Sequence, residues 1–488
     1  MNDISDHYLG HFMINGRRLP GVVSLKGQDS RLEIFADSFV HLPEEKMHVI
    51  RGVARSGEKL TICDAIGAET SGTNFYYGTT KHFLNLFPNF VAIGPRHLPI
   101  HNKVIAELFF TTSGALNLFS DIGAFGGASD KVRDVKKLMP KWAQKDRRKI
   151  EFSEVFYYID RGPIVDVRLN DMRVQAFNAP TWHLPSPRGI DVTNRVRIGI
   201  SFNRSVKLQD ALRAAYEFGY FCDVVSQTTH CIQDIEVRHR SAKEGESFIR
   251  LVVTNAETDE GTRIDFRDHL VSGGLHKQEF ETILAKWMKA KRNHRSARRR
   301  IAECIRYGNH YTADRLVGAA NAFDLLPDET VGQPSLPAGV KEALRRLKHE
   351  AGALPPPYRE QVLANLGRIK GANLRQKITA RFKALPPALR RHFPEIELVI
   401  DHAVRTRNYF VHGTAPKLPV GRTYELMFFF TDTLEFIFVA AELYACGWRY
   451  ARWLKEANMG RLREYVRSYD LHLAELKRAG GARVWQQA

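Results

Sequence analysis

Short runs of alternating apolar and polar residues fill the first half of the chain. Between residues 8 and 130 they read GRRLPGVVSL, RLEIFAD, MHVIRGVA, EKLTICDAI, NFYYGTT and VIAELFFTT, with Gly, Pro, Asp and Ser between them. Alternation with a period of two is typical of half-buried strands, and regularly spaced turn residues favour a sandwich or a barrel. A basic segment over residues 130–150 is interpreted as a linker. More strand-like runs then extend to residue 275, with one helix expected over residues 205–226.

The pattern becomes helical near residue 277. Apolar residues recur at three- and four-residue intervals over residues 276–307 (one long helix or two joined helices), 311–326, 339–350, 357–369 and 374–385. The segment PEIELVIDHAVRTRNYFVH predicts a helix with Pro394 in its first turn and Gly413 just past its end. A final apolar helix is expected from about residue 423 to 446.

These patterns predict an α+β multidomain protein with a β-rich N-terminal half, sandwich or barrel-like, followed by an all-α helical bundle. The expected division is residues 1–130 as a β-rich domain, 151–275 as a second β-rich part with one inserted helix, 277–455 as the bundle and 456–488 as a C-terminal helical tail.

The most apolar stretch is expected to be a buried core helix rather than a membrane span. It carries Glu425, Asp432, Glu435 and Glu442, and four acids would cost several kcal/mol in lipid. The N-terminus has no basic segment followed by an apolar one, so no signal peptide is predicted. The chain has five cysteines without CxxC spacing, which argues against a disulfide framework or a zinc finger and fits the reducing cytoplasm.

The chain is strongly basic. Its 72 Lys and Arg exceed its 54 Asp and Glu, which gives a formal charge of +18 and suits RNA, DNA or an anionic membrane. A basic segment over residues 286–300 is one candidate RNA-contacting surface; its alternative is a solvated helix face. Trp287 and His294 within it either stack on bases or pack inward. The candidate RNA-binding residues are Lys289, Lys291, Arg292, Arg295, Arg298, Arg299 and Arg300.

A polar stripe marks the helix that ends at Gly413. At about 100° per residue, Asp401, Arg405, Asn408 and His412 fall within an arc of about 60°. Four such groups are too costly to bury unpaired, so they pair with each other, face water, or meet a ligand or a second subunit.

The end of this helix, RNYFVH, resembles the signature of HEPN ribonucleases, in which an Arg followed by a polar residue precedes a His near the end of a helix. Together with the β-rich N-terminal half, the layout is similar to that of the ApeA-type proteins of anti-phage defence. The resemblance implies a helical-bundle nuclease. It places Arg407, Asn408 and His412 at the catalytic positions, with Arg405 and Asp401 as supporting or alternative residues.

The loose Arg–His spacing also occurs from Arg96 to His101, from Arg263 to His269 and from Arg467 to His472. Only RNYFVH lies at an expected helix end, before a glycine and ahead of a long apolar helix. The plainer alternative for this segment is an exposed polar helix end, with His412 stabilised by the helix dipole.

A regular helix raises a geometric conflict, because it turns Arg407 about 140° away from His412. Arg405 is then the better geometric partner. Otherwise the last turn unwinds before Gly413, or Arg and His come from two protomers; the resemblance favours this composite site in a homodimer.

The leading hypothesis is a metal-independent endoribonuclease of anti-phage defence, acting by abortive infection. It would use no cofactor and would cleave RNA by attack of the 2′-hydroxyl. The family resemblance suggests tRNA as a candidate substrate. The β-rich half would sense a phage-derived trigger or restrain the nuclease, and no membrane is involved. The alternatives are a non-catalytic RNA- or nucleotide-binding protein and a dimerising adaptor.

Overall fold

The fold is described from a computed structural model of the chain. It describes residues 6–38, 40, 48–70, 74–76, 79–121, 123–129, 141, 154–186, 189–254, 267–290, 292–327, 338–368 and 372–481. The chain divides into two compact units. The first comprises residues 1–216, 230–261 and 272–281, and the second comprises residues 217–229, 262–271 and 282–488. The expected linker over residues 130–150 lies, apart from residue 141, outside the described residues.

The first unit contains a closed barrel of six strands. The barrel follows the order β5-β4-β1-β2-β3-β7 and closes because β5 pairs with both β4 and β7. Its strands are β1 (Asp6–Ile14), β2 (Arg17–Leu25), β3 (Arg31–Ala36), β4 (His48–Ala54), β5 (Lys59–Thr70) and β7 (Thr79–Phe87). The alternation along the sequence therefore marks the inner and outer faces of a barrel, as expected.

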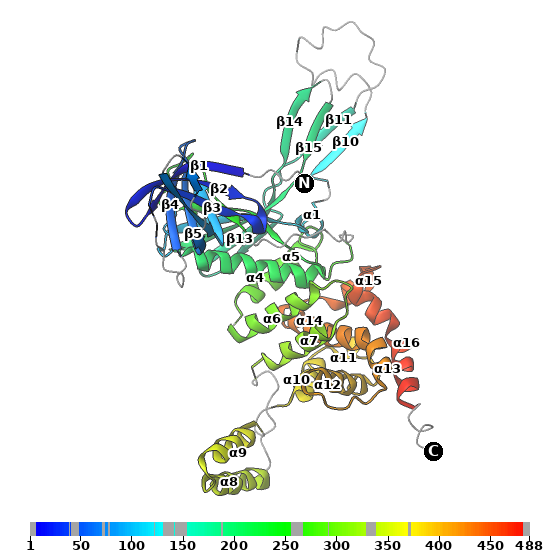
Figure 1. Cartoon of the computed structure of the whole chain (residues 1–488). Helices are drawn as coiled ribbons and strands as arrows, with labels where there is room; N and C mark the ends of the chain where they lie inside the picture. The colour runs from blue at the N-terminus through cyan, green and yellow to red at the C-terminus, as the bar shows by residue number, and fades with distance from the viewer. Residues whose placement is uncertain are drawn as a thin grey trace. The chain divides into compact units, whose positions relative to one another are not determined.

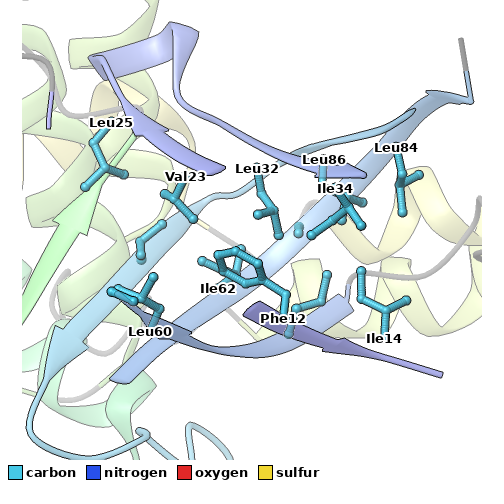
Figure 2. Packing of buried hydrophobic residues seen from close by; sticks show 14 of the residues in the cluster. Phe12, Ile14, Val23, Leu25, Leu32, Ile34, Leu60, Ile62, Leu84 and Leu86 are labelled. Atoms are coloured by element: carbon cyan, nitrogen blue, oxygen red, sulfur yellow. The ribbon is translucent and has the colours of Figure 1, made fainter. Parts of the chain in front are cut away.

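The barrel core consists of the inward-facing positions of these strands. Figure 2 shows side chains from three strands, Phe12 of β1, Val23 of β2 and Ile62 of β5, directed toward one another, and all three are fully buried. The β1–β2 hairpin turns at Asn15 and Gly16, which both have positive φ. Positive φ at both central residues is the conformation that an Asn-Gly pair adopts most readily in a tight hairpin.

One long strand connects the barrel to the rest of the sheet. The first part of β5 pairs with β8 (Phe90–Gly94) and its last part pairs with β7. Between the two parts, Asp64 has a φ of 49°, which locally breaks the ladder. The 14-stranded sheet then continues through β18 (Ile249–Val253), β17 (Ile232–His239), β9 (Ile105–Thr112), β16 (Val196–Val206), β13 (Met172–Asn178) and β12 (Val165–Arg168).

The expected boundary between residues 1–130 and 151–275 is wrong as a division of β structure. β9, from the first segment, lies between β16 and β17, from the second, and pairs with both. Strands distant in sequence share one ladder here, and alternation within a strand carries no information about its neighbours. The expected helix is confirmed as α4 (Leu208–Ser226). Outside the large sheet lie two antiparallel strand pairs, β10–β11 (Phe125–Ser129, Glu154–Tyr158) and β14–β15 (Thr181–Ser186, Gly189–Thr193).

The second unit is a helical bundle around α14 (Figure 1). Its helices are α6 (Arg292–Ile305), α7 (Ala313–Asp324), α10 (Leu374–Lys383), α11 (Pro387–Arg390), α12 (Ile396–His412), α13 (Val420–Glu425), α14 (Met427–Cys446), α15 (Tyr450–Glu456) and α16 (Arg461–Gly481), preceded by α5 (Lys277–Met288). Two further helices, α8 (Ala338–Gly352) and α9 (Pro356–Arg368), pack against each other around a small core of their own. The segment 276–307 thus forms two helices. On α7, Leu316, Ala319, Ala320 and Phe323 form an apolar face that is fully buried.

The acids of the apolar helix α14 are buried because arginines of neighbouring helices neutralise them. Glu435 forms a buried ion pair with Arg315 of α7 at 2.8 Å and a second with Arg461 of α16 at 2.6 Å. Glu442 pairs with Arg298 of α6 at 2.7 Å and with Arg381 of α10. The prediction of a buried core helix is confirmed for α14, whose acids connect it to four other helices. Glu425, which was expected on the same helix, lies exposed on the preceding α13. In the described parts of the chain, no helix has both the length and the apolar character that crossing a bilayer requires.

The C-terminal segment is part of the bundle rather than a separate tail. On α16, the rings of Tyr465 and Tyr469 lie 5.6 and 5.1 Å from that of Phe393. A second correction concerns the start of α12, which begins at Ile396, so Pro394 lies before the first turn. Glu395 adopts a left-handed conformation there, with a φ of 52°, and the hydroxyl of Tyr469 donates to the Pro394 carbonyl at 2.9 Å. These contacts redirect the chain before the helix begins.

Candidate active site

The candidate site lies at the C-terminal end of α12. The helix is regular through His412 and ends at Gly413, whose φ of 66° is the left-handed conformation that glycine adopts without strain. The Gly413 backbone N–H donates to the Tyr409 carbonyl at 2.9 Å. The predicted helix end is confirmed, and it leaves His412 exposed in the last turn.

Arg407 contacts His412 within the same chain. Its Nη1 lies 3.4 Å from Nε2 of His412 and donates to Oδ1 of Asn408 at 3.1 Å. The structure therefore brings the three predicted catalytic residues together. Neither unwinding nor a second protomer is needed for this contact, because the long arginine side chain reaches around the regular helix. The guanidinium has donors only, so the contact requires an unprotonated Nε2 on a neutral imidazole.

Two residues of α7, which the sequence did not single out, hold Arg407 from the other side. Its Nη2 donates to Oδ1 of Asn321 at 2.9 Å and lies 3.7 Å from a carboxylate oxygen of Asp324. Burial raises the pKa of Asp324, and the nearby Arg407 and Lys377 only partly oppose this. Asn321 lies 86 positions before Arg407, and nothing in a single sequence signals this pairing.

Arg405 points elsewhere and does not join this group. Its Nε lies 3.4 Å from Asp401 one turn earlier on α12, which is the ion pair expected at this spacing. Asp401 is also approached by Arg375 of α10, at 3.0 Å, and by Lys417 of the loop after α12. Burial raises the pKa of Asp401, but Lys417, Arg375 and Arg405 outweigh burial and hold that pKa below its ordinary value.

The basic segment over residues 286–300 is not a uniform surface. Arg298 is buried: it pairs with Glu442, donates to the Trp287 carbonyl and stacks 4.0 Å from the Trp287 ring centroid. Its place among the RNA-binding residues is therefore wrong, because the guanidinium neutralises a buried carboxylate. Trp287 is itself buried, so it packs inward rather than presenting a face to bases.

The remaining basic candidates differ in their exposure. Arg295 donates to the Ala290 and Met288 carbonyls at the end of α5. Arg299 and Arg300 both pair with Glu303, at 2.8 and 3.3 Å, and Arg299 is the more exposed. Lys289 is exposed. Lys291 and the side chain of Arg292 lie outside the described residues.

The other Arg–His spacings have local roles where they are described. Arg96 forms an ion pair with Glu246, donating to it at 2.6 Å, and Arg467 donates to the Asn458 carbonyl. His472 lies 3.1 Å from Glu475. Arg263 lies outside the described residues. The five cysteines are all buried and none forms a disulfide, as expected.

Comparison with known families settles the identity of both halves. The model of ApeA N-terminal domain 1 matches residues 7–287, more than half of the chain, and the model of the Apea-like HEPN domain matches residues 317–452. The chain belongs to the ApeA family of HEPN proteins. The expected family is thereby confirmed, and it is one of HEPN-type anti-phage defence proteins. No curated protein and no solved structure matched the chain.

The HEPN match of this ApeA-family chain contains the whole arrangement around Arg407. It begins within α7, ahead of Asn321, and runs past α14, so it includes α12 and the loop that carries Lys417. The basic segment over residues 286–300 precedes it.

Proposed function

We propose that this ApeA-family protein is an endoribonuclease of anti-phage defence, of the abortive-infection type, whose site is formed by Arg407, Asn408 and His412. The observation that carries the proposal is the contact of 3.4 Å between Nη1 of Arg407 and Nε2 of His412 at an exposed helix end. It joins a phosphate-binding guanidinium to an imidazole, the side chain that most often acts as a general acid or base.

The proposed reaction uses the nucleophile that RNA itself carries and needs no metal ion or cofactor. His412, with Nε2 released from its 3.4 Å contact with Arg407, takes the proton of a 2′-hydroxyl. The 2′-oxygen attacks the adjacent phosphorus, the bond from phosphorus to the 5′-oxygen breaks, and the leaving oxygen takes up a proton. The products are a 2′,3′-cyclic phosphate and a 5′-hydroxyl, and DNA is not cleaved because it lacks the nucleophile.

Arg407 has the role of stabilising the charge that develops on the phosphate. Its planar guanidinium suits a phosphate, and hydrogen bonds to Asn408 and Asn321 fix its orientation before the substrate arrives. Because these two hydrogen bonds already hold the guanidinium, it needs little reorientation when charge develops in the transition state. A preorganised charged donor stabilises that charge most effectively.

The proposal extends to partners. A tRNA anticodon loop fits as a substrate because in-line attack requires a flexible strand, and the cytoplasm is where that substrate occurs. The β-rich unit would sense a phage-derived trigger or restrain the nuclease. We further propose a homodimer with a composite active site, in which each protomer contributes one complete Arg407–His412 pair.

The decisive experiment compares wild type with His412→Ala in bacteria, with and without phage infection, by sequencing RNA ends. New 2′,3′-cyclic phosphate ends in wild type alone are the expected result, and their positions identify the substrate. Intact RNA during infection, with RNA binding retained by the purified protein, would favour the second candidate, a non-catalytic RNA- or nucleotide-binding protein. Loss of both activities with dimerisation retained would favour an adaptor.

A further inference from the structure

Three cations from three parts of the bundle converge on one carboxylate. Asp401 of α12 is contacted by Arg375 of α10, Arg405 of α12 and Lys417 of the loop between α12 and α13. Asp401 is nearly buried, whereas the side chains of Arg375, Arg405 and Lys417 are 50%, 53% and 37% exposed. We call this group the Asp401 cluster.

The Asp401 cluster carries more positive charge than its fold requires. One cation would neutralise Asp401, so three leave two positive charges uncompensated. Among the described residues, no second carboxylate pairs with any of the three cations. Holding like charges close together is unfavourable, and an anion bound between them would relieve the repulsion. The guanidinium groups of Arg375 and Arg405 and the ammonium group of Lys417 are partly exposed, so an anion from solvent can reach them.

The Asp401 cluster is aligned with the proposed catalytic site. Arg405 precedes His412 by seven residues, and both lie on one stripe of the regular helix α12, about 10 Å apart along its axis. One phosphate cannot span that distance. An anion bound at the Asp401 cluster and a phosphate bound at His412 are therefore two different phosphates of one RNA strand.

We infer that Arg375, Arg405 and Lys417 form a second phosphate-binding subsite for single-stranded RNA, which holds a backbone phosphate neighbouring the one that is cleaved. Asp401 neutralises one of the three positive charges and competes with the phosphate for these cations. This inference rests on the proposed function for the identity of the strand. It assigns Arg405 to substrate binding rather than to the chemical step.

The test measures RNA binding separately from cleavage. Full-length protein with His412→Ala is titrated against a labelled single-stranded RNA by fluorescence anisotropy over a range of salt concentrations. Arg375→Ala and Lys417→Ala are each added to this background. Lys383→Ala is the matched control, because Lys383 is an exposed cation of the same helix as Arg375 and pairs with Glu397 instead.

Each cluster substitution is expected to weaken binding about fivefold. It should also reduce the magnitude of the slope of log K against log salt by about 0.7, the value for one lost phosphate contact on a single strand. Lys383→Ala should change affinity by less than about twofold. Unchanged affinity and slope in both cluster variants would overturn the subsite, as would equal losses in the control.

Asp401→Asn separates substrate binding from a purely structural role. Removing the carboxylate frees the cations, so RNA binding is expected to tighten about twofold to fivefold. Weaker binding by this variant in its folded form would contradict the inference. The nuclease is judged independently by comparing RNA ends from wild type and His412→Ala, so either proposal can fail while the other stands.

Discussion

Nη1 of Arg407 lies 3.4 Å from Nε2 of His412 although a regular helix turns the two residues about 140° apart. The arginine side chain spans the angle because Asn321 and Asn408 hold its guanidinium from two sides. Residues of both α7 and α12 therefore position the Arg407–His412 pair.

Arg405 and Arg407 should differ in their effect on cleavage. Arg407→Ala is expected to lower kcat about 100- to 1000-fold, the usual cost of removing a charge-stabilising donor. Arg405→Ala should act mainly on KM, because Arg405 pairs with Asp401 and belongs to the proposed phosphate-binding subsite rather than to the Arg407–His412 pair. Arg407→Lys should not restore activity, since lysine lacks the planar fork. Steady-state kinetics on one RNA substrate decides, and a larger kcat effect at Arg405 would contradict this assignment.

Asn321 should behave as a positioning residue. Asn321→Ala removes the hydrogen bond of 2.9 Å to Arg407 and should lower kcat about tenfold, with KM little changed. Asn321→Asp keeps an acceptor and should retain more activity. In an Arg407→Ala background, Asn321→Ala should have no further effect, because both act through one guanidinium. Additive losses in this double-mutant cycle would show that Asn321 acts independently.

Mixing inactive protomers tests how the site is distributed over a dimer. Because Arg407 and His412 meet within one chain, a mixture of Arg407→Ala and His412→Ala proteins breaks every pair and should remain inactive. Recovery of about a quarter of the wild-type rate, the share that random pairing would give, would instead show that Arg and His act across the interface. Mass photometry of the same mixtures measures whether dimers formed.

Glu442 should contribute to stability in a pH-dependent way. Burial raises its pKa, but His294, Arg298 and Arg381 outweigh burial and lower it to about 2. Its contribution is therefore complete above its ordinary value of about 4.5 and is lost as pH falls toward 2. Glu442→Gln should cost about 3–5 kcal/mol of unfolding free energy at pH 7, because it leaves two buried arginines uncompensated.

The matched control for Glu442 is Glu425→Gln, which removes an exposed partner of Arg422 and should cost under about 1 kcal/mol. Urea denaturation of both variants, followed by tryptophan fluorescence at pH 7 and pH 3, gives the comparison. A difference between wild type and Glu442→Gln that grows on acidification would contradict the predicted sign.

Gly413 should matter for its backbone alone. Its φ is 66° and a Cβ there would meet open space, so Gly413→Ala should cost about 1–2 kcal/mol through left-handed strain, and Gly413→Asn less. Gly421 of α13 has similar space without positive φ, so Gly421→Ala should be neutral or stabilising. Thermal unfolding measures both, and equal effects would show that strain at Gly413 is unimportant.

Local patterns in the sequence were sufficient for the elements and for the motif. Alternation predicted the strands of the barrel, three- and four-residue spacing predicted α7 and α12, and Gly413 marked the helix end. These features depend on neighbouring residues of one segment. The RNYFVH spacing likewise lies within one helix, so the sequence alone identifies its residues.

Only the tertiary structure decided which strands pair, which charges are buried and which arginine meets His412. Arg298 and Arg299 are adjacent in a basic run, yet one is buried against Glu442 and the other is exposed. Asn321 reaches Arg407 across 86 positions. A hydrogen bond or an ion pair depends on distance in space, and side chains far apart in sequence meet only when packing brings their helices together.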